Sequence, residues 1–337
     1  MFNQFVGLSF LFTTAIVGMQ ISRNGALALS SPVQSQSQRI ALVTGANKGI
    51  GKEIARKLAS KEKTKGGNDD DGGDDNGNGN GNESPFLCIL GCRNEKLGLA
   101  TVQELKAEGL NVAFVRIDLQ DTESIQTAAQ HIEEKYGRCD VLINNAAVCF
   151  NDPTLYGRVD HTPFAEQASI TVSTNFFGTL CLTKAMLPLL KKSILKSPRI
   201  INIASSAGRL AILPSKERRD AFSSPVLTME DLESFMKDFI KAASKGDGTH
   251  TAEGWPNTGY GVSKVGIIAM TKILARENPT FMVNSVDPGY CATDQNNNQG
   301  FIPAERGAVT PFLLATLGEE DQSFTGVHWY EEQEIPW

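Results

Sequence analysis

Two residues in the second half of the chain have the types and spacing that proton transfer needs, Tyr260 and Lys264. They are four positions apart, so a helix places both side chains on one face, one turn from each other. A free tyrosine has a pKa of about 10 and is a poor proton donor at neutral pH. A neighbouring ammonium favours the phenolate and lowers that pKa. We therefore predict that Tyr260 acts as a general acid toward an oxygen of a bound molecule.

A second stretch is suited to hold a phosphate. Residues 40–51 read IALVTGANKGIG, an apolar strand that runs into a turn with three glycines and then into a helix. Glycine adopts positive φ and has no Cβ, so backbone N–H groups can approach a ligand closely. The helix N-terminus adds partial positive charge, which suits a pyrophosphate. The spacing is GxxxGxG and not the commoner GxGxxG. Its position at a strand–helix junction predicts a dinucleotide site, with a plain tight turn as the alternative.

Charge near this turn narrows the choice of dinucleotide. Lys48 lies in the turn, and Arg93 follows the second expected strand in ILGCRN. An acidic residue at that point would bind a free ribose 2′-hydroxyl, and this stretch has none. Two cations suit a 2′-phosphate, which arginine binds through two parallel hydrogen bonds. We predict NADPH as the cofactor; the alternative is a pair of surface charges without a partner.

The elements that must position these residues alternate between strand and helix. We expect strands at 40–44, 86–91, 112–117, 141–143, 199–203 and 282–286 and a short one within 326–337, and helices at 48–61, 96–108, 122–136, 165–190 and 260–276. This alternation predicts a parallel sheet covered on both faces, a doubly wound, Rossmann-like α/β domain. Such a domain binds its ligands at the carboxyl ends of the strands.

Several motifs follow one another in the order that is typical of the short-chain dehydrogenase/reductase family, which the chain resembles. After the glycine turn come Asp118-Leu119, Asn144-Asn145-Ala146-Ala147 where the family has NNAG, Asn175 in NFFGT, Ser205 in INIASSAG, the YxxxK of Tyr260 and Lys264, Pro288-Gly289, and Thr293. The resemblance covers residues 39–337. NFFGT, EGWPNTGYGVSKVG and the terminal Trp337 resemble the monomeric NADPH-dependent carbonyl reductases and plant enzymes that reduce terpenoid or alkaloid ketones.

The resemblance implies roles for these residues. Ser205 would hold a carbonyl oxygen beside Tyr260, Lys264 would also bind the nicotinamide ribose, and Asn175 would bind a water that links Lys264 to solvent. Ser206 is the rival to Ser205, which is preferred because it lies three residues after Asn202. The implied cofactor-binding residues are Gly45, Asn47, Lys48, Gly49, Ile50, Gly51, Arg93, Asp118, Leu119, Asn145, Ala146, Tyr260, Lys264, Pro288, Gly289 and Thr293. No metal is expected.

An insertion at residues 209–256 separates Ser205 from Tyr260. Apolar residues at helical spacing in MEDLESFMKDFIKAA (229–243) predict an amphipathic helix. The resemblance implies that this helix covers the surface that other members use to oligomerise, and hence that the protein is a monomer. Trp255 is expected to line the substrate pocket with Ser205 and Tyr260, and core packing is the alternative. Such a pocket would suit an apolar ketone, aldehyde or quinone.

These observations favour NADPH-dependent reduction of a ketone, aldehyde or quinone. An NADP-dependent sterol or terpenoid alcohol dehydrogenase and a non-catalytic nucleotide-binding sensor are the alternatives. The formal charge of −6 derives from residues 66–84, which contain six acidic residues and no basic one. The remainder is balanced and predicts no nucleic-acid partner. That acidic segment has no apolar residue and is expected to be a disordered insertion. The six cysteines are scattered, without CxxC, and are expected to be reduced.

The first 31 residues have the character of a leader. Residues 5–19 are almost wholly apolar, a run shorter than the roughly 20 residues that cross a bilayer. Ala26-Leu27-Ala28 resembles a cleavage site, although no basic residue precedes the apolar run. We expect a signal for the secretory pathway or an organelle. A retained membrane anchor and a disordered tail of a cytoplasmic protein are the alternatives.

Overall fold

The computed structural model describes residues 37–60, 85–150, 162–318 and 324–337. The expected leader and the acidic insertion at 66–84 lie outside these residues. Within the described ranges, no helix combines the length and the apolar character that crossing a membrane requires.

The core of the fold is one sheet of eight strands in the order β3-β2-β1-β4-β5-β6-β7-β8. The strands are β1 (Ile40–Thr44), β2 (Leu87–Cys92), β3 (Val112–Arg116), β4 (Val141–Asn144), β5 (Arg199–Ile203), β6 (Met282–Asp287), β7 (His328–Tyr330) and β8 (Gln333–Ile335). All neighbours pair in parallel except β7 and β8, so the tail contains two strands where the sequence predicted one. The chain moves outward from β1 to β3 and then returns to β4 beside β1. This reversal creates the crevice in which doubly wound sheets bind ligands.

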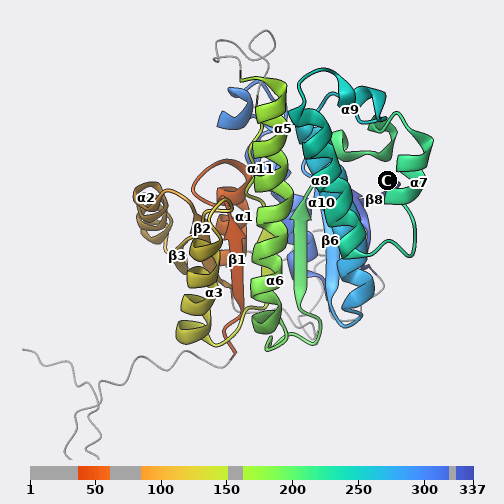
Figure 1. The fold of residues 1–337 in the computed structure, drawn as a ribbon. Helices are drawn as coiled ribbons and strands as arrows, with labels where there is room; N and C mark the ends of the chain where they lie inside the picture. The colour runs from red at the N-terminus through yellow and green to blue at the C-terminus, as the bar shows by residue number, and fades with distance from the viewer. Residues whose placement is uncertain (1–36, 61–84, 151–161, 319–323) are drawn as a thin grey trace, which may run out of the picture. The chain divides into compact units, whose positions relative to one another are not determined.

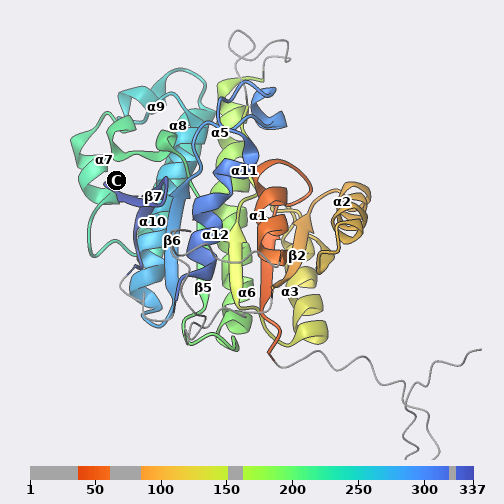
Figure 2. The same ribbon diagram turned by 180° about the vertical axis from the view of Figure 1, so that it is seen from behind.

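Helices cover both faces of the sheet (Figures 1 and 2). One face carries α3 (Thr122–Tyr136), α5 (Phe164–Val172), α6 (Thr179–Leu190) and α10 (Gly259–Glu277); the other carries α1 (Gly49–Ala59), α2 (Glu95–Ala107), α11 (Ala304–Gly307) and α12 (Val309–Thr316). The strands are buried, and their apolar side chains form two cores, one between each face of the sheet and the helices that cover it. The predicted doubly wound α/β fold is confirmed.

The long helix expected at 165–190 is interrupted. A π-helical turn, Ser173–Gly178, joins α5 to α6. A Cβ at Gly178 would lie 2.2 Å from the carbonyl oxygen of Leu119, so only glycine permits this close approach. Turns of this type are frequent at functional sites. Asn175 lies inside it.

The insertion before α10 contains α7 (Lys216–Phe222), α8 (Met229–Ser244) and α9 (Thr249–Ala252). A capping box between Thr228 and Asp231 begins α8. The side chains of Leu232, Met236 and Phe239 are fully buried, as an amphipathic helix predicts. In Figure 1, α8 lies against α5 and α10.

Candidate active site

A cleft of about 350 Å³ lies at the carboxyl ends of β1, β4, β5 and β6. It brings together residues that are far apart in the sequence: Ile50, Asn145, Ala147, Cys149, Ile203, Ala204, Ser205, Ser206, Ala207, Tyr260, Lys264, Asp287, Pro288, Gly289, Tyr290, Cys291, Thr293, Gln295 and Asn296. Ser205, Tyr260 and Lys264 therefore share one cavity, at the edge of the sheet where the fold predicts a ligand.

Helix α10 positions Tyr260 and Lys264. Its first turn is capped by Thr258, whose Oγ1 accepts a hydrogen bond from the N–H of Gly261 at 3.0 Å. Lys264 is 3 % exposed, and its Nζ donates to the carbonyl oxygen of Ile203 at 2.7 Å. The same Nζ lies 5.5 Å from the centroid of the Tyr260 ring. The helix thus holds the amine beside the phenol while β5 anchors it.

Burial is the main influence on the pKa values of both side chains, and it raises the pKa of Tyr260 but lowers that of Lys264. Burial raises the pKa of Tyr260, and Cys149 and Asp287 add to that effect, whereas hydrogen bonds with Ser205 and Gln295 lower it. Burial lowers the pKa of Lys264 to about 8, against the opposing charges of Cys149 and Asp287. The sequence predicted that the ammonium lowers the tyrosine pKa and that a positively charged nicotinamide acts in the same direction. Among the protein groups burial is the dominant influence, and Lys264 Nζ donates its hydrogen bond to Ile203. A lowered pKa of Tyr260 beside the bound cofactor stays a prediction.

Ser205 follows the end of β5 and lines the cleft together with Tyr260. Its Oγ accepts from the N–H of Ala207 at 3.2 Å, and its side chain acts to lower the pKa of Tyr260. Ser206 lines the cleft but does not act on the phenol, which supports the choice of Ser205. The following turn packs on α10 so closely that a Cβ at Gly208 would lie 2.7 Å from the Lys264 backbone.

The last residue of the chain fastens this turn. Trp337 donates its indole N–H to the carbonyl oxygen of Gly208 at 2.8 Å. In the sequence Trp337 indicated only the subgroup, and its hydrogen bond to Gly208, three residues after Ser205, could not be predicted from the pattern.

The side chain of Asn175 forms hydrogen bonds with two other parts of the site, the segment after β4 and helix α10. Its Oδ1 accepts from the N–H of Val148 at 2.8 Å. Its Nδ2 donates to the carbonyl oxygen of Val148 at 2.9 Å and to Ser263 Oγ at 3.1 Å. The amide therefore ties the segment after β4 to α10. The water link to Lys264 stays a prediction.

The glycine turn has the conformation that a phosphate cradle needs. Gly45 and Gly49 have φ values of 66° and 54°, which favour glycine. A Cβ at Gly51 would lie 2.4 Å from Asn145 Nδ2, so the turn and the end of β4 touch. The side chain of the N-cap residue, Lys48, makes no capping hydrogen bond to α1 in the described structure, so the N–H groups of the first turn can bind an anion. These features fit a dinucleotide pyrophosphate.

Lys48 and Arg93, the two cations that predict NADPH as the cofactor, have different surroundings. Lys48 Nζ lies 3.0 Å from Asp294 Oδ2, and both side chains are exposed. Arg93 is exposed after β2 and forms no ion pair with any residue that the structure describes. Arg93 is therefore more available to a 2′-phosphate than Lys48.

The other predicted cofactor residues lie at the same edge of the sheet. Asn47 belongs to the glycine turn, and its carbonyl oxygen accepts from Thr101 Oγ1 at 3.1 Å. Asp118 and Leu119 follow β3, and Asp118 Oδ1 accepts from the N–H of Gln120 at 3.1 Å. Ala146 donates its N–H to Thr44 Oγ1 at 2.9 Å, which fixes the turn after β4 against β1.

Trp255 does not line the cleft, and its prediction as a substrate wall is wrong. Its side chain is fully buried, with Phe222 and Phe239 in edge contact at 6.2 and 5.4 Å between ring centroids. The Arg218 guanidinium lies 3.7 Å from its ring centroid. The alternative, core packing of the insertion, is the one observed. Sequence reasoning missed Cys149, Asp287, Tyr290, Cys291 and Gln295, which do line the cleft. The position of Asp287 directly before Pro288-Gly289 was the available signal.

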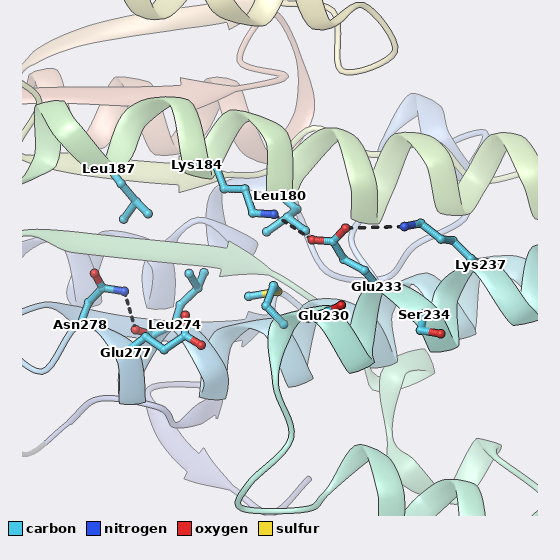
Figure 3. Close-up of a pocket in the computed structure, with 11 residues that line it drawn as sticks. Leu180, Lys184, Leu187, Glu230, Glu233, Ser234, Lys237, Leu274, Glu277 and Asn278 are labelled. Atoms are coloured by element: carbon cyan, nitrogen blue, oxygen red, sulfur yellow. Dashed lines mark hydrogen bonds and ion pairs between the residues drawn. The ribbon is translucent and has the colours of Figure 1, made fainter.

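A larger hollow of about 640 Å³ lies between α6, α8 and α10 (Figure 3). Glu233 pairs there with Lys184 at 2.8 Å and with Lys237 at 3.9 Å. The hollow is on the helix layer, away from the strand ends, and brings none of the predicted catalytic groups together. The smaller cleft is therefore the candidate active site.

The fold and the cleft define a class, the dinucleotide-binding α/β proteins with a serine, tyrosine and lysine at the sheet edge. The family model described as short chain dehydrogenase matches residues 83–214. Carbonyl reductase (NADPH) 1 of Mus musculus is 34% identical over 310 residues, which cover 90% of this chain and 100% of the relative. Carbonyl reductase (NADPH) 3 of Mus musculus is 36% identical over 290 residues, or 84% and 92% of the two chains.

Two solved structures are similar as well. Salutaridine reductase from Papaver somniferum aligns with a TM-score of 0.71 and 26% identity over 87% of this chain and 99% of the other. Menthone neomenthol reductase from Mentha piperita aligns with a TM-score of 0.69 and 27% identity over the same shares. The chain belongs to the short-chain dehydrogenase/reductase family.

Proposed function

We propose that the protein reduces the carbonyl group of ketones, aldehydes or quinones with NADPH. One observation carries the proposal: Ser205, Tyr260 and Lys264 line one cleft at the carboxyl ends of the strands, and Ser205 acts there to lower the pKa of the phenol. The similarity to carbonyl reductases whose names specify NADPH supports both the reaction and the cofactor.

The side chains of the cleft have different roles in the proposed reaction. The hydroxyls of Ser205 and Tyr260 hydrogen-bond the carbonyl oxygen and orient it. When bound, NADPH supplies the hydride for the carbonyl carbon. Tyr260 gives its proton to the oxygen as negative charge develops there. Lys264, buried and held by Ile203, donates to the ribose and adds positive charge below the phenol.

The cofactor would occupy the edge of the sheet from β3 to β6. The glycine turn and the N-terminus of α1 hold the pyrophosphate, and Asp118 with Leu119 borders the adenine. Arg93 binds the 2′-phosphate, and Lys48 contributes after sharing or releasing Asp294. The segments at Asn145 and Pro288 border the nicotinamide.

The same residues also permit the alternative direction, oxidation of a sterol or terpenoid alcohol with NADP. A non-catalytic sensor has less support, since it would not need a serine that shares the cleft with the tyrosine and lowers its pKa.

We further propose that the protein is a monomer. Helix α8 buries its apolar face on α5 and α10, which supports the idea that the insertion covers the surface used for oligomerisation. Light scattering at micromolar concentration would report a single chain; a stable tetramer contradicts the proposal. The leader is proposed to be a cleaved targeting signal, and a mature protein that begins at Met1 would contradict this.

The experiment that tests the function is NADPH oxidation against a panel of ketones, aldehydes and quinones, with NADP-dependent oxidation of alcohols run in parallel. We expect faster turnover in the reductive direction and a loss of about 10²- to 10⁴-fold in kcat for Tyr260→Phe, the range for removal of a general acid. The Kd for NADPH should stay within about twofold, because the phenol is not needed for the phosphate contacts. Turnover that survives in Tyr260→Phe would refute the mechanism.

A further inference from the structure

A short turn at the mouth of the cleft, η4 (Asp294–Asn296), is fastened from within. Asn296 Oδ1 accepts from the N–H of Thr293 at 3.2 Å, and the N–H of Asn296 donates to the Thr293 carbonyl oxygen at 3.1 Å. Asn296 Nδ2 donates to the carbonyl oxygen of Cys291 at 2.9 Å. The backbone on both sides of Gln295 is therefore fixed.

The same turn is also fastened across the cleft. Lys48 of the glycine turn pairs with Asp294, the residue directly before Gln295, at 3.0 Å. A Cβ at Gly49 would lie 3.3 Å from the Thr293 methyl group, so the two turns are in contact. Gln295 thus lies between two neighbours that are held in place, which fixes the position of its backbone beside the cleft.

Gln295 lines the active-site cleft together with Ser205, Tyr260 and Lys264. Its side chain and that of Ser205 are the two polar groups that lower the pKa of Tyr260. A glutamine amide carries two N–H donors, whereas a serine hydroxyl has one. The phenol therefore has one polar neighbour on the turn after β5 and another on the turn after β6.

We propose that Gln295 is a further catalytic residue, whose side-chain amide donates a hydrogen bond to the phenolic oxygen of Tyr260 throughout proton transfer. The inference rests on the proposed function. As the substrate is reduced, the phenol O–H bond breaks, its electron pair stays on the phenolic oxygen, and the proton forms the O–H bond of the product alcohol. The amide N–H stabilises the charge that this step leaves on the tyrosine.

The charges around Tyr260 explain why such a donor matters. The titratable groups that face the same cleft are Cys149 after β4, Lys264 on α10, Asp287 at the end of β6, and Tyr290 and Cys291 beyond it. Cys149 and Asp287 act with burial to raise the pKa of Tyr260, and Ser205 and Gln295 act against it. Without the Gln295 amide, Ser205 alone would oppose burial, Cys149 and Asp287, which all raise the pKa of Tyr260.

Kinetics of Gln295→Met give the first test, because methionine has a similar length and no N–H. We expect kcat at neutral pH to fall about tenfold, the effect of one hydrogen bond to a charged oxygen. The alkaline fall of kcat should move to higher pH, since the phenol then loses its proton less readily. The matched control is Gln299→Met, at an exposed position on the same segment. It should change neither quantity, and the Kd for NADPH should be unchanged in both variants.

NMR of isotope-labelled tyrosine gives a second test that does not depend on turnover. The Tyr260 ring resonance is identified by its loss in Tyr260→Phe. It should move in Gln295→Met and stay in place in Gln299→Met. An unmoved resonance overturns the contact, and a moved resonance with an unchanged pH profile overturns the catalytic role. Absence of carbonyl reduction by the unmodified protein would instead refute the proposed function, while the resonance still reports on the contact.

Discussion

Lys264 lies one helical turn beyond Tyr260, with its ammonium 5.5 Å from the centroid of the phenol ring and hydrogen-bonded to the carbonyl oxygen of Ile203 at 2.7 Å. The amine is thus fixed by β5 and not by the phenol. The groups that lower the pKa of Tyr260 are Ser205 and Gln295, whereas burial, Cys149 and Asp287 raise it. The acidity of the tyrosine in this protein therefore depends on residues that follow β4, β5 and β6 at the sheet edge.

The burial of Lys264 predicts a pH dependence of stability. Its pKa falls from 10.5 to about 8 on folding, so between these values the unfolded chain binds more protons than the folded protein. The contribution of this group to the free energy of unfolding should therefore rise with pH across this window, by about 3 kcal/mol. Below pH 8 both states are protonated, and the cost of burying the charge is fully present. Buried cysteines such as Cys88 and Cys139, whose pKa values burial raises, act in the opposite direction in any variant that keeps them. Denaturant unfolding across the window should therefore show that the stability of the wild type increases relative to that of Lys264→Met. Parallel curves would contradict the buried, neutralised lysine.

Cofactor choice should depend on Arg93 more than on Lys48. Arg93→Ala removes a cation that forms no ion pair within the described part of the chain, whereas Lys48 already pairs with Asp294. We expect the Kd for NADPH to rise about 10- to 100-fold in Arg93→Ala and less in Lys48→Ala, with the Kd for NADH unchanged in both. Fluorescence titration with both nucleotides measures this, and Lys106→Ala on the exposed side of α2 is the control. A larger effect at Lys48 would reverse the assignment.

The C-terminal residue should affect catalysis through the turn that carries Ser205. Trp337→Phe keeps an aromatic ring but removes the N–H that donates to Gly208 at 2.8 Å. Loss of this bond should reduce the free energy of unfolding by about 1 kcal/mol. It should also lower kcat several-fold, because the Ser205 hydroxyl is held less firmly against Tyr260. Thermal unfolding and steady-state kinetics of the variant check both effects. Unchanged kcat would show that the turn is held by its packing on α10 alone.

Several parts of the structure follow from local sequence pattern and others do not. The helix at 122–136 and the strand at 199–203 have the predicted bounds, since each has a clear apolar period and clear ends. The π turn at Asn175 depends on contact between Gly178 and Leu119, which no helical period reveals. Gln295 was missed for a similar reason: its place in the cleft depends on a turn that is held by contacts of Asn296 and Lys48. Site residues on regular elements were predictable, and those placed by contacts between loops were not.

Substitution of Trp255 tests whether this side chain packs in the core of the insertion and not in the substrate pocket. Its ring is fully buried beside Phe222 and Phe239, so Trp255→Ala should lower the free energy of unfolding by about 3–5 kcal/mol. Trp255→Phe should cost much less, because the indole N–H has no hydrogen-bond partner among the described residues and the new ring fills most of the space. Since the side chain lies outside the cleft, KM for a carbonyl substrate should be the same in Trp255→Phe as in the wild type. Chemical denaturation and steady-state kinetics measure the two quantities. A rise in KM without a loss of stability would return Trp255 to the substrate pocket.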